Sequence, residues 1–258
     1  MKKLNRALLS AALLTLAHSA GAVVVTASTD GNALANAIAG SGVTVTNVVF
    51  SGASPTAAGT FTQGGNIGFD KGVLLTTGTV DCAAGPNYSS NCSGTGSTTS
   101  LKFDFTSNNG NVYFRYVFAS EEYNEYVGSG FNDLFEMRLN GVNVALLPNG
   151  GGVVSINNVN NGSNAAYFRD NATGTYATGY DGLTTILTAQ ATGLSGTNTF
   201  EFFISDRGDA NLDSGVFIEA GTFSDTPPPP SDVPEPGSLA LVGLGLAALG
   251  RLKRRSAQ

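Results

Sequence analysis

The stretch Val112-Tyr113-Phe114-Arg115-Tyr116-Val117-Phe118-Ala119 has the strongest structural pattern in the chain. Its even-numbered residues are all apolar or aromatic, and they fall on one face if the segment is extended. A strand with one fully apolar face must cover that face with other secondary-structure elements. The segments before and after it therefore determine the kind of fold.

Other short β-branched and aromatic runs, bounded by Gly, Asn and Ser, recur on both sides of this stretch. They are Thr44–Phe50, Gly72–Thr77, Leu101–Phe105, Phe135–Leu139, Val142–Leu147, Val153–Val159, Leu183–Ala189, Phe200–Ser205 and Gly215–Phe223. Asn140-Gly141 supplies a type I′ hairpin turn. The one expected helix is Asn32–Ala39, with Asp30 as its N-cap. The pattern predicts an all-β fold, an antiparallel β-sandwich or jelly-roll-like single domain, over residues 23–225.

The first 22 residues have the order of a secretory signal peptide. Lys2, Lys3 and Arg6 precede an apolar run, and Ala20-Gly21-Ala22 offers small residues for cleavage. We therefore expect residues 1–22 to be removed on export. The alternative is a retained anchor, but the apolar run is about half of the roughly 20 residues that a spanning helix needs.

The C-terminal residues combine a spacer, a short motif and an apolar segment. Residues 226–236 form a Pro-rich linker in which Pro227–Pro230 should be stiff and extended. The linker ends in the motif Val233, Pro234, Glu235 and Pro236. Residues 237–258 then form an apolar helix with a basic end, which places that end in the cytoplasm and the body outside.

This order resembles the PEP-CTERM tail. The resemblance implies that exosortase, a membrane peptidase, recognises the tail and removes the transmembrane helix. The protein would then be held at the inner membrane transiently and end at the cell surface or in the extracellular matrix. A permanent membrane anchor remains the alternative.

The charge of the body limits its partners. Residues 23–225 carry six basic and 17 acidic residues, a net charge of −11. Such a surface repels phosphate backbones, so we expect no nucleic-acid partner. It attracts cations, although plain solubility explains an acidic surface equally well.

Two cysteines, Cys82 and Cys92, are the only ones in the chain. Both lie in the part expected to be exported, where an oxidising compartment favours a disulfide between them. Closing so small a ring should contribute about 2–3 kcal/mol to stability. Two free thiols are the alternative.

Histidine is missing from the exported part, because the single histidine, His18, lies in the expected signal peptide. This excludes Ser-His-Asp and Cys-His catalysis and the usual zinc sites from that part. The chemistry left to it is that of carboxylates, and we expect no enzyme.

Carboxylates gather directly after two predicted strands, where ligands are commonly bound. The candidate ligands for Ca²⁺ are Glu121, Glu122, Asp133, Asp206, Asp209 and Asp213. Crowded acids repel one another, and a hard cation removes that repulsion. The spacing of Asp209, Asn211 and Asp213 begins like an EF-hand, but Ser214 replaces the required Gly and Ala220 the final Glu. We therefore expect a calcium site of another design, with solvated acidic loops as the alternative.

The same segments resemble the choice-of-anchor L domain. The resemblance rests on residues 114–126, 131–135, 180–184 and 206–219, with residues 72–85 similar to the start of the domain. It implies a surface domain that occurs with different anchors. It implies no enzymatic activity and no particular ligand.

These observations predict a non-catalytic binding, adhesion or structural module that contacts extracellular polysaccharide or a surface protein. Tyr123 and Tyr126 are candidates for stacking on sugar rings, with packing at the rim of the loops as the alternative. A carboxylate-dependent glycan-active enzyme is the second hypothesis. It would pair Glu121, Glu122 or Glu125 with Asp206 or Asp209.

Overall fold

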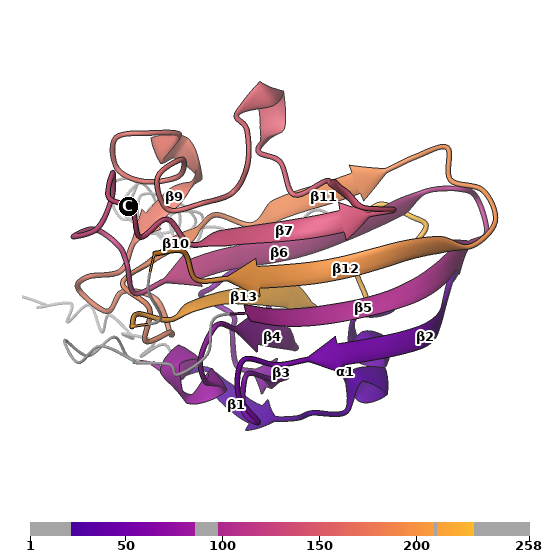
Figure 1. Ribbon diagram of the computed structural model, residues 1–258, viewed down its shortest axis with the longest axis horizontal. Coiled ribbons are helices and arrows are strands. Elements are labelled where there is room, and N and C mark those ends of the chain that lie inside the picture. The colour runs from indigo at the N-terminus through magenta and orange to yellow at the C-terminus, as the bar shows by residue number, and fades with distance from the viewer. Residues whose placement is uncertain (1–21, 86–97, 209–210, 230–258) are drawn as a thin grey trace, which may run out of the picture.

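The computed structural model describes residues 22–85, 98–208 and 211–229 (Figure 1). The predicted signal peptide up to Gly21, Cys92, Asp209 and the sorting segment that begins with Val233 lie outside these ranges. Within them, no helix is both long enough and apolar enough to cross a membrane.

Two antiparallel sheets pack face to face, which confirms the predicted β-sandwich. The larger sheet has the order β1 (Val24–Ala27), β3 (Ala58–Thr62), β4 (Gly72–Thr76), β13 (Ser214–Glu219), β6 (Val112–Ser120), β10 (Gly182–Thr184) and β9 (Phe168–Asp170), and β11 (Leu187–Ala191) also pairs with β6. The smaller sheet has the order β2 (Val43–Ser51), β5 (Thr98–Ser107), β12 (Asn198–Ser205), β7 (Leu134–Leu139) and β8 (Val142–Asn143). Short 3₁₀ turns span Val80–Ala83, Pro148–Gly150 and Ala165–Tyr167.

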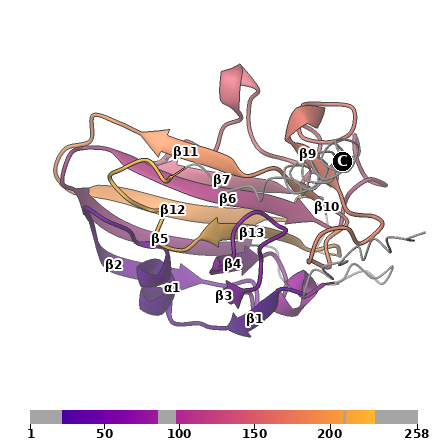
Figure 2. The same cartoon turned by 180° about the vertical axis from the view of Figure 1, so that it is seen from behind.

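Helix α1 (Gly31–Ile38) closes one edge of the sandwich (Figure 2). Asp30 caps it as predicted, since its Oδ1 accepts a hydrogen bond of 3.1 Å from the Ala33 amide. The helix buries Leu34 and Ile38 and contacts β2 and β5 of one sheet and β3 and β4 of the other.

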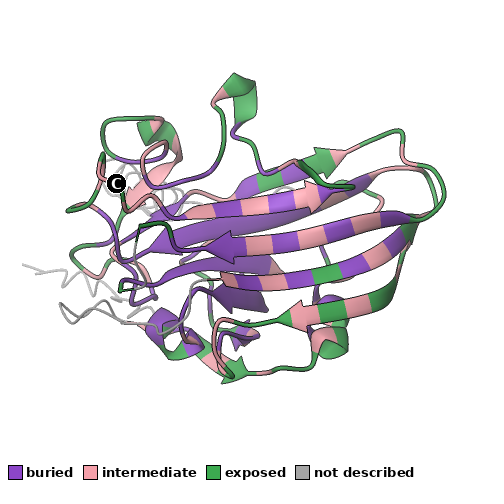
Figure 3. Ribbon diagram, in the orientation of Figure 1, coloured by how far each residue is buried: buried purple, intermediate pink, exposed green. Residues whose placement is uncertain are grey.

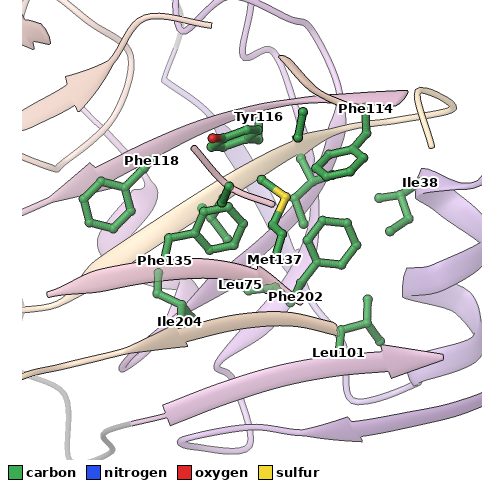
Figure 4. Packing of buried hydrophobic residues seen from close by; sticks show 14 of the residues in the cluster. Ile38, Leu75, Leu101, Phe114, Tyr116, Phe118, Phe135, Met137, Phe202 and Ile204 are labelled. Atoms are coloured by element: carbon green, nitrogen blue, oxygen red, sulfur yellow. The ribbon is translucent and has the colours of Figure 1, made fainter. Parts of the chain in front are cut away.

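The core between the sheets is built from the apolar face of β6. Phe114, Tyr116 and Phe118 are fully buried, as the alternation predicted. They pack with Phe202 and Met137 from the smaller sheet (Figure 4). The predicted apolar face of β6 is thus confirmed.

The other face of the larger sheet is also covered near β4 and β13. There Val117 and Ala119 of β6 join a second hydrophobic cluster with Leu74, Phe217 and Tyr180. Figure 3 shows the consequence: the smaller sheet alternates buried and less buried residues, whereas the central strands of the larger sheet are mostly buried. The loops that cover this face also bring polar residues to the end of the sandwich.

Several predicted strands differ from the structure. The Asn140-Gly141 turn is confirmed by positive φ values of 49° and 85°, but the strand after it ends at Asn143. The Asn143 side-chain oxygen accepts from the Met137 and Ala145 amides and so takes over part of the hydrogen bonding of a longer ladder.

Two further strand predictions were wrong. Residues 153–159 form isolated bridges and turns instead of a strand, and Leu183–Ala189 is divided between β10 and β11. The sequence did not predict β1, β3 or β9, which are short and carry little periodic signal.

Candidate functional site

Strand pairing brings the two predicted groups of acids to the same end of the sandwich. In the larger sheet Ser120, the last residue of β6, lies opposite Ser214, the first residue of β13. In the smaller sheet Ser205, the last residue of β12, lies opposite Leu134, the first residue of β7. All four strand ends meet at the left side of Figure 1. The residues next to these ends are the predicted acids.

Five acidic residues form what we call the carboxylate cluster, and all five are buried. They are Glu121, Glu122, Asp133, Asp206 and Asp213. Their exposed fractions lie between 0 and 8%. The sequence had placed them on loops, which favours exposure, so their burial is the main new feature of the site. The sixth predicted ligand, Asp209, lies outside the described residues.

Asp133 links the two sheets. Its Oδ2 accepts a hydrogen bond of 2.8 Å from the Ser214 hydroxyl, and its Oδ1 accepts one of 2.8 Å from the Arg207 amide. Ser214 belongs to the larger sheet, whereas Asp133 and Arg207 adjoin strands of the smaller one. The carboxylate therefore holds both sheets together at this end.

Asp213 is packed against the loop that follows β4. Its Oδ2 accepts from the Thr79 amide at 3.1 Å and lies 3.1 Å from the Cys82 sulfur. Its carbonyl oxygen accepts from the Glu121 amide at 3.0 Å. Whether Cys82 forms the predicted disulfide with Cys92 remains a prediction, since Cys92 lies outside the described residues.

Gly78 leaves space for the Asp213 carboxylate. A Cβ at position 78 would lie 2.1 Å from both carboxylate oxygens, far inside van der Waals contact. Gly78→Ala should therefore lower stability by about 1–3 kcal/mol, as overpacking does. Gly130→Ala is the matched control, because a Cβ there meets nothing within 4 Å. Thermal melting of both variants checks the prediction, and equal melting temperatures would contradict it.

Burial changes the proton affinity of the cluster. Desolvation raises the pKa of Glu121 to about 8, and the charges of Asp181, Asp213 and Glu125 add to this effect.

Desolvation likewise raises the pKa of Asp206 to about 8. The nearby Thr77 hydroxyl lowers it, whereas Asp133 and Asp213 raise it further. At neutral pH and without a cation, Glu121 and Asp206 therefore hold protons in the folded protein.

The donors of the cluster suit a hard cation in kind, because they are all carboxylate oxygens. Both oxygens of Asp206 are buried, beside the Thr77 hydroxyl and the Asp133 carboxyl. Among residues 22–85, 98–208 and 211–229, however, no three His, Cys, Asp or Glu side chains are placed to hold one metal ion. A cation site would thus need a further ligand or a closer approach of these side chains.

The two candidate tyrosines for sugar stacking differ in exposure. Tyr123 is fully buried, and its ring centroid lies 4.7 Å from that of Phe168. It presents no face to solvent and packs in the core instead. Tyr126 is 39% exposed and makes an edge contact with Phe131. Only Tyr126 is thus placed to meet a ligand from solution.

Three residues near the cluster were not singled out as site residues. Tyr180 is fully buried, and the charges of Asp213, Glu121 and Asp206 help burial to hold its pKa well above the ordinary value. The charge of Asp181 raises the pKa of Glu121, and the Thr77 hydroxyl lowers the pKa of Asp206. The available signal was the Tyr180-Asp181-Gly182 segment, which resembled a family motif without an assigned role.

Comparison with known families agrees with the two resemblances. The model of the choice-of-anchor L domain matches residues 23–224, so the chain belongs to this family. The PEP-CTERM protein-sorting motif matches residues 232–255. No curated protein and no solved structure matches the chain significantly. The two family matches indicate an exported, surface-anchored protein that is sorted by exosortase.

Proposed function

We propose that this protein is a non-catalytic binding and structural module of the cell surface, and that Ca²⁺ in the carboxylate cluster stabilises its fold. The observation that carries the proposal is the burial of five acids at the ends of β6, β7, β12 and β13. Ionising these buried acids together is unfavourable, and a divalent cation would offset that cost. The acids come from both sheets, so a bound cation would hold the two sheets together.

Asp209 is the most suitable further ligand. It lies between Asp206 and Asp213 in the chain, three residues from one and four from the other. This short separation keeps it within reach of the cluster. Its carboxylate is a ligand of the kind that calcium sites use, since Ca²⁺ takes six to eight oxygen ligands in flexible geometry.

The alternative of a glycan-active enzyme has less support. A glycosidase needs two carboxyl groups that line a sugar-sized cleft. Two hollows of the described residues, one beside Arg115 and Pro227–Pro229 and one beside Val142 and Thr188, have no carboxylate in their walls. The acids of the cluster are buried instead, and the families found are of the sorting and anchoring type. A binding or structural role is therefore the better proposal.

Calcium should stabilise the full chain at pH 8. A ligand of the native state at about 100 times its Kd contributes roughly 2.7 kcal/mol, which should raise the melting temperature by about 5–10 °C relative to chelator. Asp206→Asn should abolish this rise. Asp70→Asn, which replaces an exposed acid, should preserve it. A melting temperature that is the same with calcium and with chelator would refute the calcium site.

The partner can be sought with a glycan array, probed with the full chain in calcium and in chelator. Binding that is lost in chelator would support a calcium-dependent polysaccharide module. Absence of binding in both conditions would favour a structural or protein-binding role. Hydrolysis of a matrix polysaccharide that Glu122→Gln abolishes would contradict the non-catalytic part of the proposal.

A further inference from the structure

The start of the Pro-rich linker lies in a groove on the outer face of the larger sheet. The floor of the groove is the β6–β11 pair, in which Arg115 lies opposite Thr188 and Tyr113 opposite Gln190. The hollow left between this floor and Pro227–Pro229 has a volume of about 490 Å³. The sequence had predicted only that these prolines form a stiff, extended spacer.

Arg115 holds the linker through a fixed guanidinium. Its Nε and Nη2 donate to the two carboxylate oxygens of Glu219, the latter at 2.7 Å. Its Nη1 donates to the Pro229 carbonyl at 2.9 Å. The paired fork with Glu219 sets the orientation of the remaining donor. Arg115 is only 9% exposed, so little of this contact is open to water.

The chain is also fixed just before the prolines. The Tyr113 amide donates to the Ser224 carbonyl at 2.9 Å, and the Asn109 side chain donates to the Asp225 carbonyl at 3.0 Å. The Asp225 amide donates to the Ser41 carbonyl at 2.9 Å. These bonds fix the position and direction of the chain where it enters the groove.

The chemistry of the groove suits a polyproline segment. Such a segment has no amide hydrogens to add to a sheet, but it presents carbonyl oxygens on a stiff, preformed backbone. Recognition of this conformation commonly combines an aromatic surface with a hydrogen-bond donor. Tyr113 and Arg115 provide these two features on neighbouring positions of one strand face.

We infer that the face formed by β6 and β11 is a polyproline-binding groove whose occupant is the chain's own segment Pro227–Pro229. The groove then sets where the sorting tail leaves the domain. Pro234 follows Pro229 by five residues, which span at most about 18 Å. A docked linker thus keeps the exosortase motif close to the domain surface, and release of the linker lengthens its reach.

The test compares the full-length chain in mild detergent with a variant that combines Pro227→Gly, Pro228→Gly and Pro229→Gly. These substitutions lie outside both hydrophobic clusters, so the fold should persist. We expect the guanidinium N–H signals of Arg115 to shift in NMR spectra and the ¹H–¹⁵N NOE of Thr226 to fall. The guanidinium signals of Arg138, which pairs with Glu136 and Glu201 in the other sheet, are the internal control and should not move. Unchanged Arg115 signals would refute the proposal that Pro227–Pro229 occupy the groove.

A second variant tests the role of the two hydrogen bonds from the Arg115 guanidinium to Glu219. Arg115→Lys keeps a positive charge beside Glu219 but loses the planar arrangement of donors. The Thr226 NOE should fall as it does in the glycine variant, and combining the two changes should add nothing. An additive effect would show that Arg115 does not act through the prolines. Exosortase processing in cells, measured as the ratio of unprocessed to processed chain, should change in both variants; unchanged processing with a released linker would refute only the effect on sorting.

Discussion

Replacing Phe200 with alanine should lower the free energy of unfolding by about 3–5 kcal/mol, a typical loss for a large aromatic residue in a well-packed core. Phe200 is fully buried on β12. Its ring centroid lies 4.9 Å from that of Phe202, 5.0 Å from Phe223 and 5.3 Å from Phe114. These rings come from both sheets and from the segment after β13, so the cavity would lie where three parts of the chain meet.

A residue three positions further along the same strand provides the control. Phe203 faces away from the core, where the guanidinium carbon of Arg138 lies 3.8 Å from its ring centroid. Phe203→Ala removes an aromatic group of the same size but should lower stability by only about 1 kcal/mol. Thermal melting of the two variants should differ by roughly 10 °C. Similar losses would mean that the two faces of β12 are not divided into core and surface as described.

The alternation of β12 and β6 shows why the fold class could be predicted. A period of two places every second residue on one face, and this holds whichever strands lie beside it. The order of the strands could not be predicted in this way, because it depends on distant pairings: Ser120 pairs with Ser214, which lies 94 positions further along the sequence. Nothing local in the sequence specifies such a pairing. The acids could therefore be placed at strand ends, but their assembly into one cluster could not be derived.

The burial of the cluster also depends on contacts between distant segments. Asp133 is covered because Ser214 of the other sheet bonds to it. Asp213 is covered by the loop that contains Gly78 and Thr79. Each acid, taken with its own neighbours in sequence, looks like an exposed loop residue. The linker groove could not be predicted for the same reason. A run of prolines predicts a stiff backbone, but it does not indicate the surface on which that backbone lies.

Asparagine explains the failure of the predicted strand at residues 153–159. The apolar residues there suggested a strand, but the Asn158 side chain donates to the Gly151 and Val153 carbonyls. The Asn160 side chain donates to the Ile156 carbonyl. These bonds satisfy backbone acceptors locally and so stabilise turns in place of a ladder. Periodicity alone could not reveal that competition.

The stability of the protein should fall as the pH rises from about 5 to 8.5, when a chelator removes calcium. In the unfolded chain Glu121 and Asp206 lose their protons near pH 4. In the folded chain burial raises both pKa values to about 8, so the protons stay bound over the interval between. Unfolding then releases protons, which means that a rise in pH favours the unfolded state. We expect the melting temperature to drop by several degrees over this range.

Asp206→Asn should make this pH dependence weaker, because the amide cannot ionise in the buried site. Its melting temperature should exceed that of the parent at pH 8.5 and approach it near pH 4, where the parent carboxyl is neutral as well. Asp70→Asn, at an exposed position, should follow the parent curve throughout. At pH 8.5, calcium should raise the melting temperature of the parent but not that of the Asp206 variant. The reason is that the cation offsets a charge that appears only when the carboxyl loses its proton. A parent melting temperature that stays constant or rises with pH in chelator would mean that these carboxyls do not carry the charge that the proposed cation is meant to neutralise.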